Sequence, residues 1–142
     1  MIVDVRNLQE KVKIDKKEIK KCAGSVLEMM DEARSELSIL VVSDSRIRDL
    51  NRRYRGKDSS TDVLAFSMRA GEGVSKDSPI LGDVVISAET AKREAAKRKI
   101  PVKKEICLYV IHGILHLLGY RDQTPYDRKK MKAKERALLE AV

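Results

Sequence analysis

The run Leu37-Ser38-Ile39-Leu40-Val41-Val42 is short and almost continuously apolar. A run of this kind is typical of a strand that is covered on both faces. Further strands are expected at residues 2–5, 62–67 and 80–87. Between the last two, residues 69–79 hold glycines, a proline and mixed charge, which predicts a surface loop.

Helices are expected between and after these strands. Asp15 and Glu18 form a capping box, Ser43 and Ser87 can each cap a further helix, and Pro101 and Thr124-Pro125 mark the beginnings of the last two. The buried stripe of the first helix comprises Ile19, Cys22, Ala23, Val26, Leu27 and Met30. The last helix offers Met131, Ala137 and Leu138 for packing. This alternation predicts an α+β fold with a small mixed sheet of about four strands and about five helices.

The composition describes a densely charged globular chain. Hydrophobic residues make up 42% and charged residues 37% of the 142 positions, which argues against an intrinsically disordered protein. This length suits a single domain, residues 1–142, whose core needs no disulfide. The net charge of +8 favours a polyanionic partner, although many of the charges would form solvated helix faces.

Nothing in the sequence points to secretion or to a membrane. The first residues show no basic region followed by an apolar run, and the longest apolar tract, residues 106–118, is too short for a membrane span. Cys22 and Cys107 each lie in an apolar helical pattern, where buried, inert thiols are the usual outcome. The sequence leaves a disulfide between them open but does not require one, so the reducing cytoplasm is the expected location.

The stretch His112-Gly113-Ile114-Leu115-His116-Leu117-Leu118-Gly119-Tyr120-Arg121-Asp122 contains both histidines of the chain. Histidines four residues apart lie on one face of a helix and can bind one cation from the same side. Gly119 can adopt the left-handed conformation that ends a helix, so the chain can turn back and bring Asp122 to the same ion. The sequence therefore predicts a metal site of His112, His116 and Asp122, on a helix similar to that of the zincins, with one coordination position left open.

The residue after the first histidine bears on the reaction. Metalloproteases carry a glutamate there as general base, whereas this chain has Gly113. Phosphodiester cleavage depends less on such a base, because the cation polarises a phosphoryl oxygen and lowers the pKa of bound water. Arginines in the segment 51–58 can bind the phosphate. Arg55 is the candidate catalytic residue, although the sequence does not rank it above Arg52 or Arg53.

Four blocks together resemble the YbeY family of bacterial endoribonucleases. They are Asn51 to Asp58, Thr61 to Phe66, Leu81 to Ile86, and His112 to Tyr120, in the family's order and at similar spacing. The resemblance implies a metal-dependent, single-strand-specific endoribonuclease that acts in ribosomal RNA maturation, especially of small-subunit RNA, and in ribosome quality control. It also implies a zinc ion at the histidine motif, with His112 and His116 as two of its ligands and Arg55 as a functionally important arginine.

The chain departs from the family pattern at the third metal ligand. The family motif usually continues Gly-Tyr-Asp-His, whereas this chain has Gly119-Tyr120-Arg121-Asp122. Asp122 brings a negative charge and a harder oxygen donor than histidine. Zinc stays the expected ion, while nickel, manganese and iron become easier to accommodate. Two histidines and one carboxylate also hold iron in non-haem oxygenases, but in a different order along the chain.

Two other functions stay open at this stage. One is a non-catalytic ribosome assembly factor, whose basic surface binds RNA while the metal braces the fold. The other is a metallohydrolase that acts on peptide or amide bonds, which Gly113 disfavours. The expected partners are single-stranded regions of ribosomal RNA and small-subunit ribosomal proteins, with no membrane involved.

Overall fold

The computed structural model describes residues 1–69 and 77–142, so most of the loop expected at 69–79 lies outside the described residues. Within the described ranges the chain forms four strands and five helices, which confirms the predicted α+β class. In chain order these are β1 (Ile2–Asn7), α1 (Lys16–Met29), β2 (Glu36–Val42), α2 (Asp44–Arg55), β3 (Val63–Ser67), β4 (Ile80–Ser87), α3 (Ala88–Arg98), α4 (Val102–Leu117) and α5 (Pro125–Ala141).

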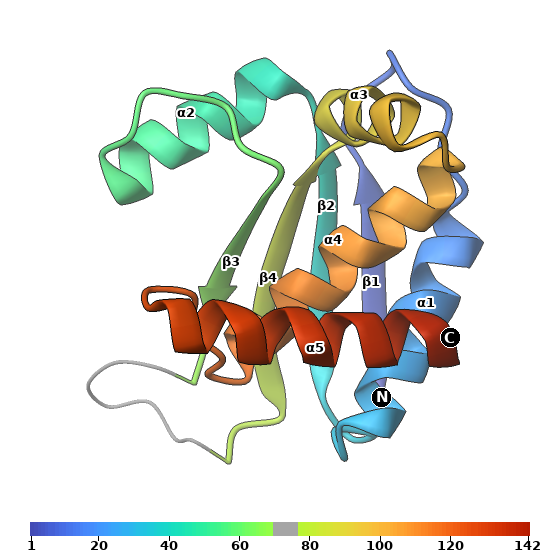
Figure 1. Cartoon of the computed structure of the whole chain (residues 1–142), viewed down its shortest axis with the longest axis vertical. Coiled ribbons are helices and arrows are strands. Elements are labelled where there is room, and N and C mark those ends of the chain that lie inside the picture. Colours follow the sequence, from blue (N-terminus) through green and yellow to red (C-terminus); the bar gives the residue numbers. More distant parts are fainter. Residues whose placement is uncertain (70–76) are drawn as a thin grey trace.

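The four strands form one mixed sheet in the order β1-β2-β4-β3 (Figure 1). Strands β1, β2 and β4 run parallel, and β3 pairs antiparallel with β4 at the edge. The apolar run at residues 37–42 is therefore an interior strand. Its side chains enter both cores, with Ile39 on one face and Val42 on the other, as expected of a strand covered on both sides.

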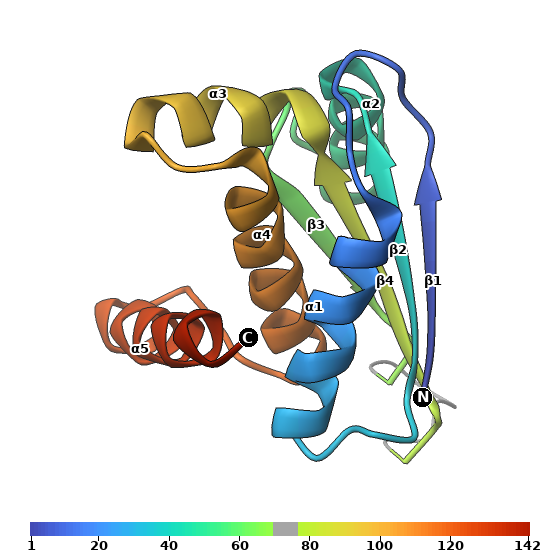
Figure 2. The ribbon, with the colours of Figure 1, turned by 90° about the vertical axis from the view of Figure 1, so that its right-hand side faces the viewer.

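Helices cover both faces of the sheet. Figure 2 shows α1 and α4 on one face, α2 on the other, and α5 on the outer side of α4. The larger core lies between the sheet and α1 and α4. A smaller core forms beneath α2 and comprises Val42, Ile47, Leu64 and Val85. Helix α4 is therefore held between the sheet and α5, which makes it the most enclosed helix.

The helix beginnings follow the local signals in the sequence. Asp15, Ser43, Ser87 and Thr124 each accept a hydrogen bond from a backbone N–H in the first turn of α1, α2, α3 and α5. Pro101 immediately precedes α4 rather than forming its first residue. No helix in the described ranges is long and apolar enough to cross a membrane.

The two cysteines differ from expectation. Cys22 of α1 and Cys107 of α4 form a disulfide and are not two separate thiols. Their Cα atoms lie 6.1 Å apart, which is in the usual range for a bridged pair. The two positions are 85 residues apart in sequence, and only the packing of α1 against α4 brings them together.

Candidate metal centre

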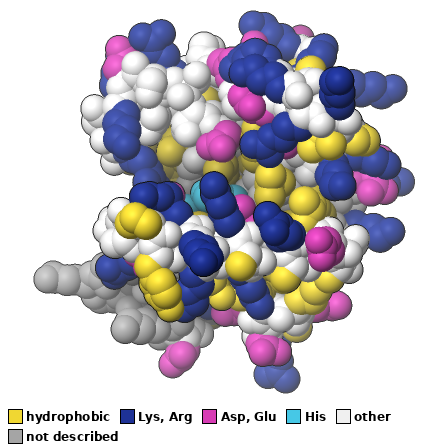
Figure 3. Space-filling model, viewed as in Figure 1, with side chains coloured by type: hydrophobic (Ala, Val, Ile, Leu, Met, Phe, Trp, Pro, Cys, Tyr) yellow, Lys and Arg dark blue, Asp and Glu magenta, His cyan; other side chains and the backbone are white. Residues whose placement is uncertain are grey.

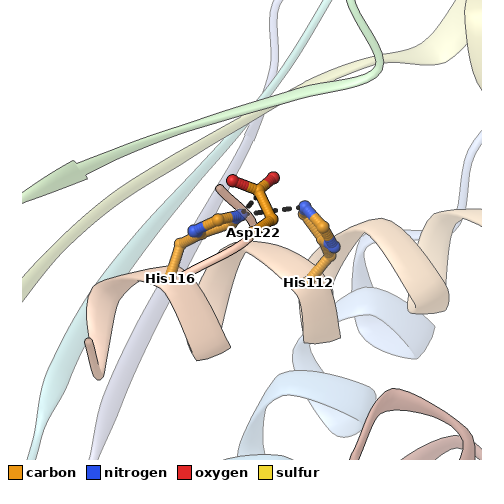
Figure 4. Close-up of side chains that lie close together, drawn as sticks. All are labelled: His112, His116 and Asp122. Atoms are coloured by element: carbon orange, nitrogen blue, oxygen red, sulfur yellow. Dashed lines mark hydrogen bonds and ion pairs between the residues drawn. The ribbon is translucent and has the colours of Figure 1, made fainter. Parts of the chain in front are cut away.

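The structure brings together the three side chains that the sequence singles out as metal ligands. Figure 4 shows His112 and His116 on the same side of α4, with Asp122 beside them. The two Nε2 atoms are 3.0 Å apart, and Oδ2 of Asp122 lies 3.5 Å from Nε2 of His116. One ligand atom from each residue falls within 4.8 Å of the other two.

The turn after α4 places Asp122 at this site. Gly119 has a φ of +96°, a backbone conformation that a residue with a side chain rarely adopts. The chain reverses there and runs into α5, whose first turn is capped by Thr124. A short loop thus returns the carboxylate to the helix that carries both imidazoles.

The spacing of the donor atoms fits a small divalent cation. A tetrahedral zinc ion with bonds of about 2.0 Å places neighbouring donors about 3.3 Å apart, close to the separations of 3.0 and 3.5 Å found here. The His112, His116 and Asp122 side chains are 30%, 28% and 52% exposed, so one side of the group faces solvent. The group can therefore hold an ion and leave a position for water or substrate.

The two imidazoles have opposite pKa shifts. Burial alone would lower the pKa of His112, but the hydrogen bond and negative charge of Glu135 outweigh it and raise the value. Burial and the neighbouring charge of His112 lower the pKa of His116. A second positive charge is disfavoured in this pair, so at neutral pH at least one imidazole offers its lone pair to a cation.

Glu135 of α5 contacts Nδ1 of His112, a partner that the sequence analysis does not identify. Glu135 follows Met131 by four residues and precedes Leu138 by three, so it lies on the same helix face as these two buried side chains. An acidic residue on the apolar stripe of a helix is the sequence signal that points to it.

Arg55 lies at the last turn of α2 and reaches the edge strand β3. Its Nη2 atom donates a hydrogen bond of 2.9 Å to the carbonyl oxygen of Ala65, and its guanidinium carbon lies 5.9 Å from the centre of the Phe66 ring. Its positive charge adds to the effects that lower the pKa of His116, after burial and the charge of His112. The positive charge of Arg55 is therefore felt at the His116 imidazole.

The neighbouring arginines have carboxylate partners. Arg52 and Arg53 both pair with Asp49, at 2.6 and 3.4 Å. In the part of the chain that the structure describes, no carboxylate forms an ion pair with Arg55. The structure thus separates Arg55 from Arg52 and Arg53, which the sequence left equivalent.

Known proteins are similar to this chain in sequence, and one solved structure is similar to it in fold. The family model for endoribonuclease YbeY matches residues 4–142. Endoribonuclease YbeY of Syntrophus aciditrophicus is 40% identical over 141 residues, which cover 98% of this chain and 88% of that protein. The protein of that name from Pelotomaculum thermopropionicum is 41% identical over 145 residues, covering 98% and 95%. The solution structure of TM1509 from Thermotoga maritima superposes with a TM-score of 0.67 at 25% identity, covering 98% of this chain and 87% of that one. By its sequence, this chain belongs to the YbeY family of endoribonucleases.

Proposed function

We propose that residues 1–142 act as one domain, a metal-dependent endoribonuclease that cleaves single-stranded regions of RNA. Its role would be the maturation of small-subunit ribosomal RNA and ribosome quality control in the cytoplasm. The observation that carries the proposal is the convergence of His112, His116 and Asp122 on one solvent-facing point with Arg55 nearby, in a chain of this family. Zinc is the proposed ion, because two nitrogen donors and one carboxylate suit it.

The bound ion and the residues around the site would have different roles in phosphodiester cleavage. A divalent ion bound there would polarise a phosphoryl oxygen and lower the pKa of a bound water. Arg55 would bind the phosphate oxygens, since its guanidinium is held by the Ala65 carbonyl and has no carboxylate ion pair among the described residues. That arrangement leaves its remaining N–H groups for the substrate.

The surface beside the site suits an RNA backbone. Figure 3 shows a histidine side chain in a hollow of this face, with several lysine and arginine side chains around it. Helix α5, which borders the site, carries Arg128, Lys129, Lys130, Lys132, Lys134 and Arg136. A phosphate backbone would bind these cations in a salt-dependent manner. Small-subunit ribosomal proteins are further proposed partners.

Peptide hydrolysis is disfavoured by the packing at position 113. A Cβ atom there would lie 2.6 Å from Cγ1 of Val84. A side chain at that position would have to displace the Val84 side chain, so the glutamate that metalloproteases use as a base does not fit the packing found here. A non-catalytic assembly factor with a structural ion differs from the proposal only in lacking turnover, so the decisive experiment measures cleavage.

The test uses purified protein, an end-labelled single-stranded RNA and the same RNA annealed to its complement. We expect cleavage of the single strand in preference to the duplex, loss of cleavage with a chelator, and recovery when zinc is restored. The His116→Ala variant should be inactive, whereas Gln123→Ala, an exposed change in the loop that carries Asp122, should retain activity. Equal cleavage by His116→Ala and the parent would identify a contaminating nuclease and overturn the proposal. Zinc binding by a parent that cleaves no RNA would favour the assembly factor.

A further inference from the structure

Helix α5 carries one carboxylate that points toward the protein interior. Its outer positions are rich in lysine and arginine, whereas the Glu135 side chain is only 14% exposed. The position follows from the buried stripe of α5, which includes Met131 and Leu138. An acidic group buried to this extent needs a partner, and that partner is the His112 imidazole.

The contact is made at the ring nitrogen that faces away from the proposed ion. Glu135 meets Nδ1 of His112, while Nε2 of the same ring points to Nε2 of His116 at 3.0 Å. When the ring is neutral, a carboxylate at Nδ1 favours the tautomer with the hydrogen on that nitrogen, which leaves the lone pair of Nε2 directed at the shared point. For His116, an interaction with the backbone of Tyr120 acts to raise the pKa, against the larger effects of burial and of the His112 charge. His112 therefore has an anchor outside the proposed coordination sphere.

We propose that Glu135 is a positioning residue that fixes the tautomer and orientation of His112 and thereby strengthens zinc binding. Histidine ligands to metals commonly donate their second N–H to a carboxylate, and loss of such a partner typically weakens metal affinity about 10–100-fold. The inference rests on the proposed function, because it takes His112 as a ligand. It adds a residue from a different helix, which ties the geometry of the site to the docking of α5 on α4.

The experiment compares four proteins: the parent, Glu135→Leu, Glu135→Gln and Glu140→Leu. Leucine keeps the bulk that packs α5 but removes the acceptor, and glutamine keeps a neutral acceptor. Glu140 is an exposed acid on the same helix and serves as the matched control. Zinc affinity is measured by competition with a chromophoric chelator. The tautomer of His112 in the zinc-free proteins is read from the ¹⁵N and ¹H chemical shifts of its ring.

We expect Glu135→Leu to weaken zinc binding about 10–100-fold, Glu135→Gln to weaken it less, and Glu140→Leu to leave it unchanged. At a pH high enough for His112 to be neutral, its remaining proton should reside on Nδ1 in the parent and distribute over both ring nitrogens in Glu135→Leu. Circular dichroism should show the same helix content in all four proteins.

Parental zinc affinity in a folded Glu135→Leu variant would overturn the inference. It would also be overturned if the variant lost affinity together with helix content while its tautomer stayed unchanged, because Glu135 would then only stabilise α5. Neither result bears on the proposed function. That function fails separately if the parent binds no zinc, or if His116→Ala binds zinc as tightly as the parent does.

Discussion

Gly113 of α4 lies directly against Val84 of β4, so that a Cβ atom at position 113 would stand 2.6 and 2.8 Å from the two methyl carbons of that valine. Real Cβ atoms do not approach other carbons so closely. The glycine between the two halves of the histidine motif is thus what lets the helix rest on the sheet. The distance between β4 and the part of α4 that carries His112 and His116 therefore depends on Gly113.

Substituting Gly113 by alanine should therefore destabilise the protein, although alanine is the better helix former by about 1 kcal/mol. We expect a net loss of about 1–3 kcal/mol in the free energy of unfolding, because overpacking forces α4 and β4 apart. In the double variant Gly113→Ala/Val84→Ala the new methyl group fills space that the valine leaves. The loss in free energy of unfolding of the double variant, measured with urea, should be smaller than the sum of the losses in the two single variants. If the two losses in free energy were strictly additive, there would be no steric conflict between positions 113 and 84.

Asp122 is the third candidate ligand, and two substitutions of it should behave differently. Asp122→Ala removes a donor and should reduce zinc affinity by more than the roughly 10–100-fold seen when an outer partner is lost. Asp122→His supplies a nitrogen donor and should keep most of the affinity. Competition titration with a chelator measures both, with Gln123→Ala as control. If Asp122→Ala bound zinc like the parent, the carboxylate would not be a ligand.

Arg55 should be needed for cleavage but not for metal binding. Arg55→Lys keeps a positive charge yet loses the planar pair of donors. We expect the single-turnover rate on single-stranded RNA to fall about 100- to 1,000-fold, with unchanged zinc affinity. Arg53→Lys is the matched control, because Arg53 already pairs with Asp49 on the same helix. Similar small losses in both variants would mean that Arg55 is only part of a general basic surface.

Asp44 should contribute to the loss of stability in acid. Burial raises its pKa, but hydrogen bonds from Arg93, Ser87 and Thr90 outweigh burial and leave the pKa below its ordinary value. The stabilisation is complete above the unfolded-state pKa of about 3.9 and disappears as pH falls through the lower folded-state value. Asp44→Asn should cost about 1–3 kcal/mol at pH 7 and flatten the decline in stability below about pH 5.

Urea unfolding at a series of pH values measures this effect. The control is Asp58→Asn, which removes an exposed ion pair with Arg48 and should change the stability little, because solvent screens such a pair. An acid decline that is equally steep in the parent and in Asp44→Asn would assign the pH dependence to other groups.

Reduction of the Cys22–Cys107 disulfide should lower the stability of the whole fold. The bridge closes a loop of 85 residues, and removing such a bridge typically costs about 2–5 kcal/mol. For a chain of this length that corresponds to a fall in Tm of roughly 10 °C. The Cys22→Ala/Cys107→Ala variant should melt at the reduced protein's temperature and show no response to a reductant. A parent whose Tm does not change on reduction would show that the bridge adds no stability.

The parts of the fold that depend on neighbouring residues could be predicted from the sequence. The apolar run at residues 37–42 identified a strand covered on both faces, and the caps at Asp15 and Ser43 follow directly from local hydrogen bonds. Strand order could not be predicted, because β2 pairs with β4 across a long connection through α2 and β3. The pairing of Cys22 with Cys107 required knowledge of which helices touch.

The same limit applies to the candidate site. The spacing of His112 and His116 and the glycine turn before Asp122 are short-range features, and the structure places the three side chains together. On α5 the sequence predicts packing at Ala137, which is exposed, whereas Glu135, which meets His112, is not among the predicted site residues. Which face of α5 meets α4 is decided by tertiary packing, and helical spacing alone does not supply it.

The C-terminal helix is attached to the rest of the protein by few buried residues, chiefly Met131 and Leu138. Asp122 in the preceding loop and Glu135 within the helix both meet the histidines of α4. An ion bound at this point would therefore help to hold roughly the last 25 residues against α4. Removal of the ion by a chelator should therefore favour local unfolding of this C-terminal segment before the rest of the protein unfolds. A protease should then cut at residues 118–124 while the sheet stays folded.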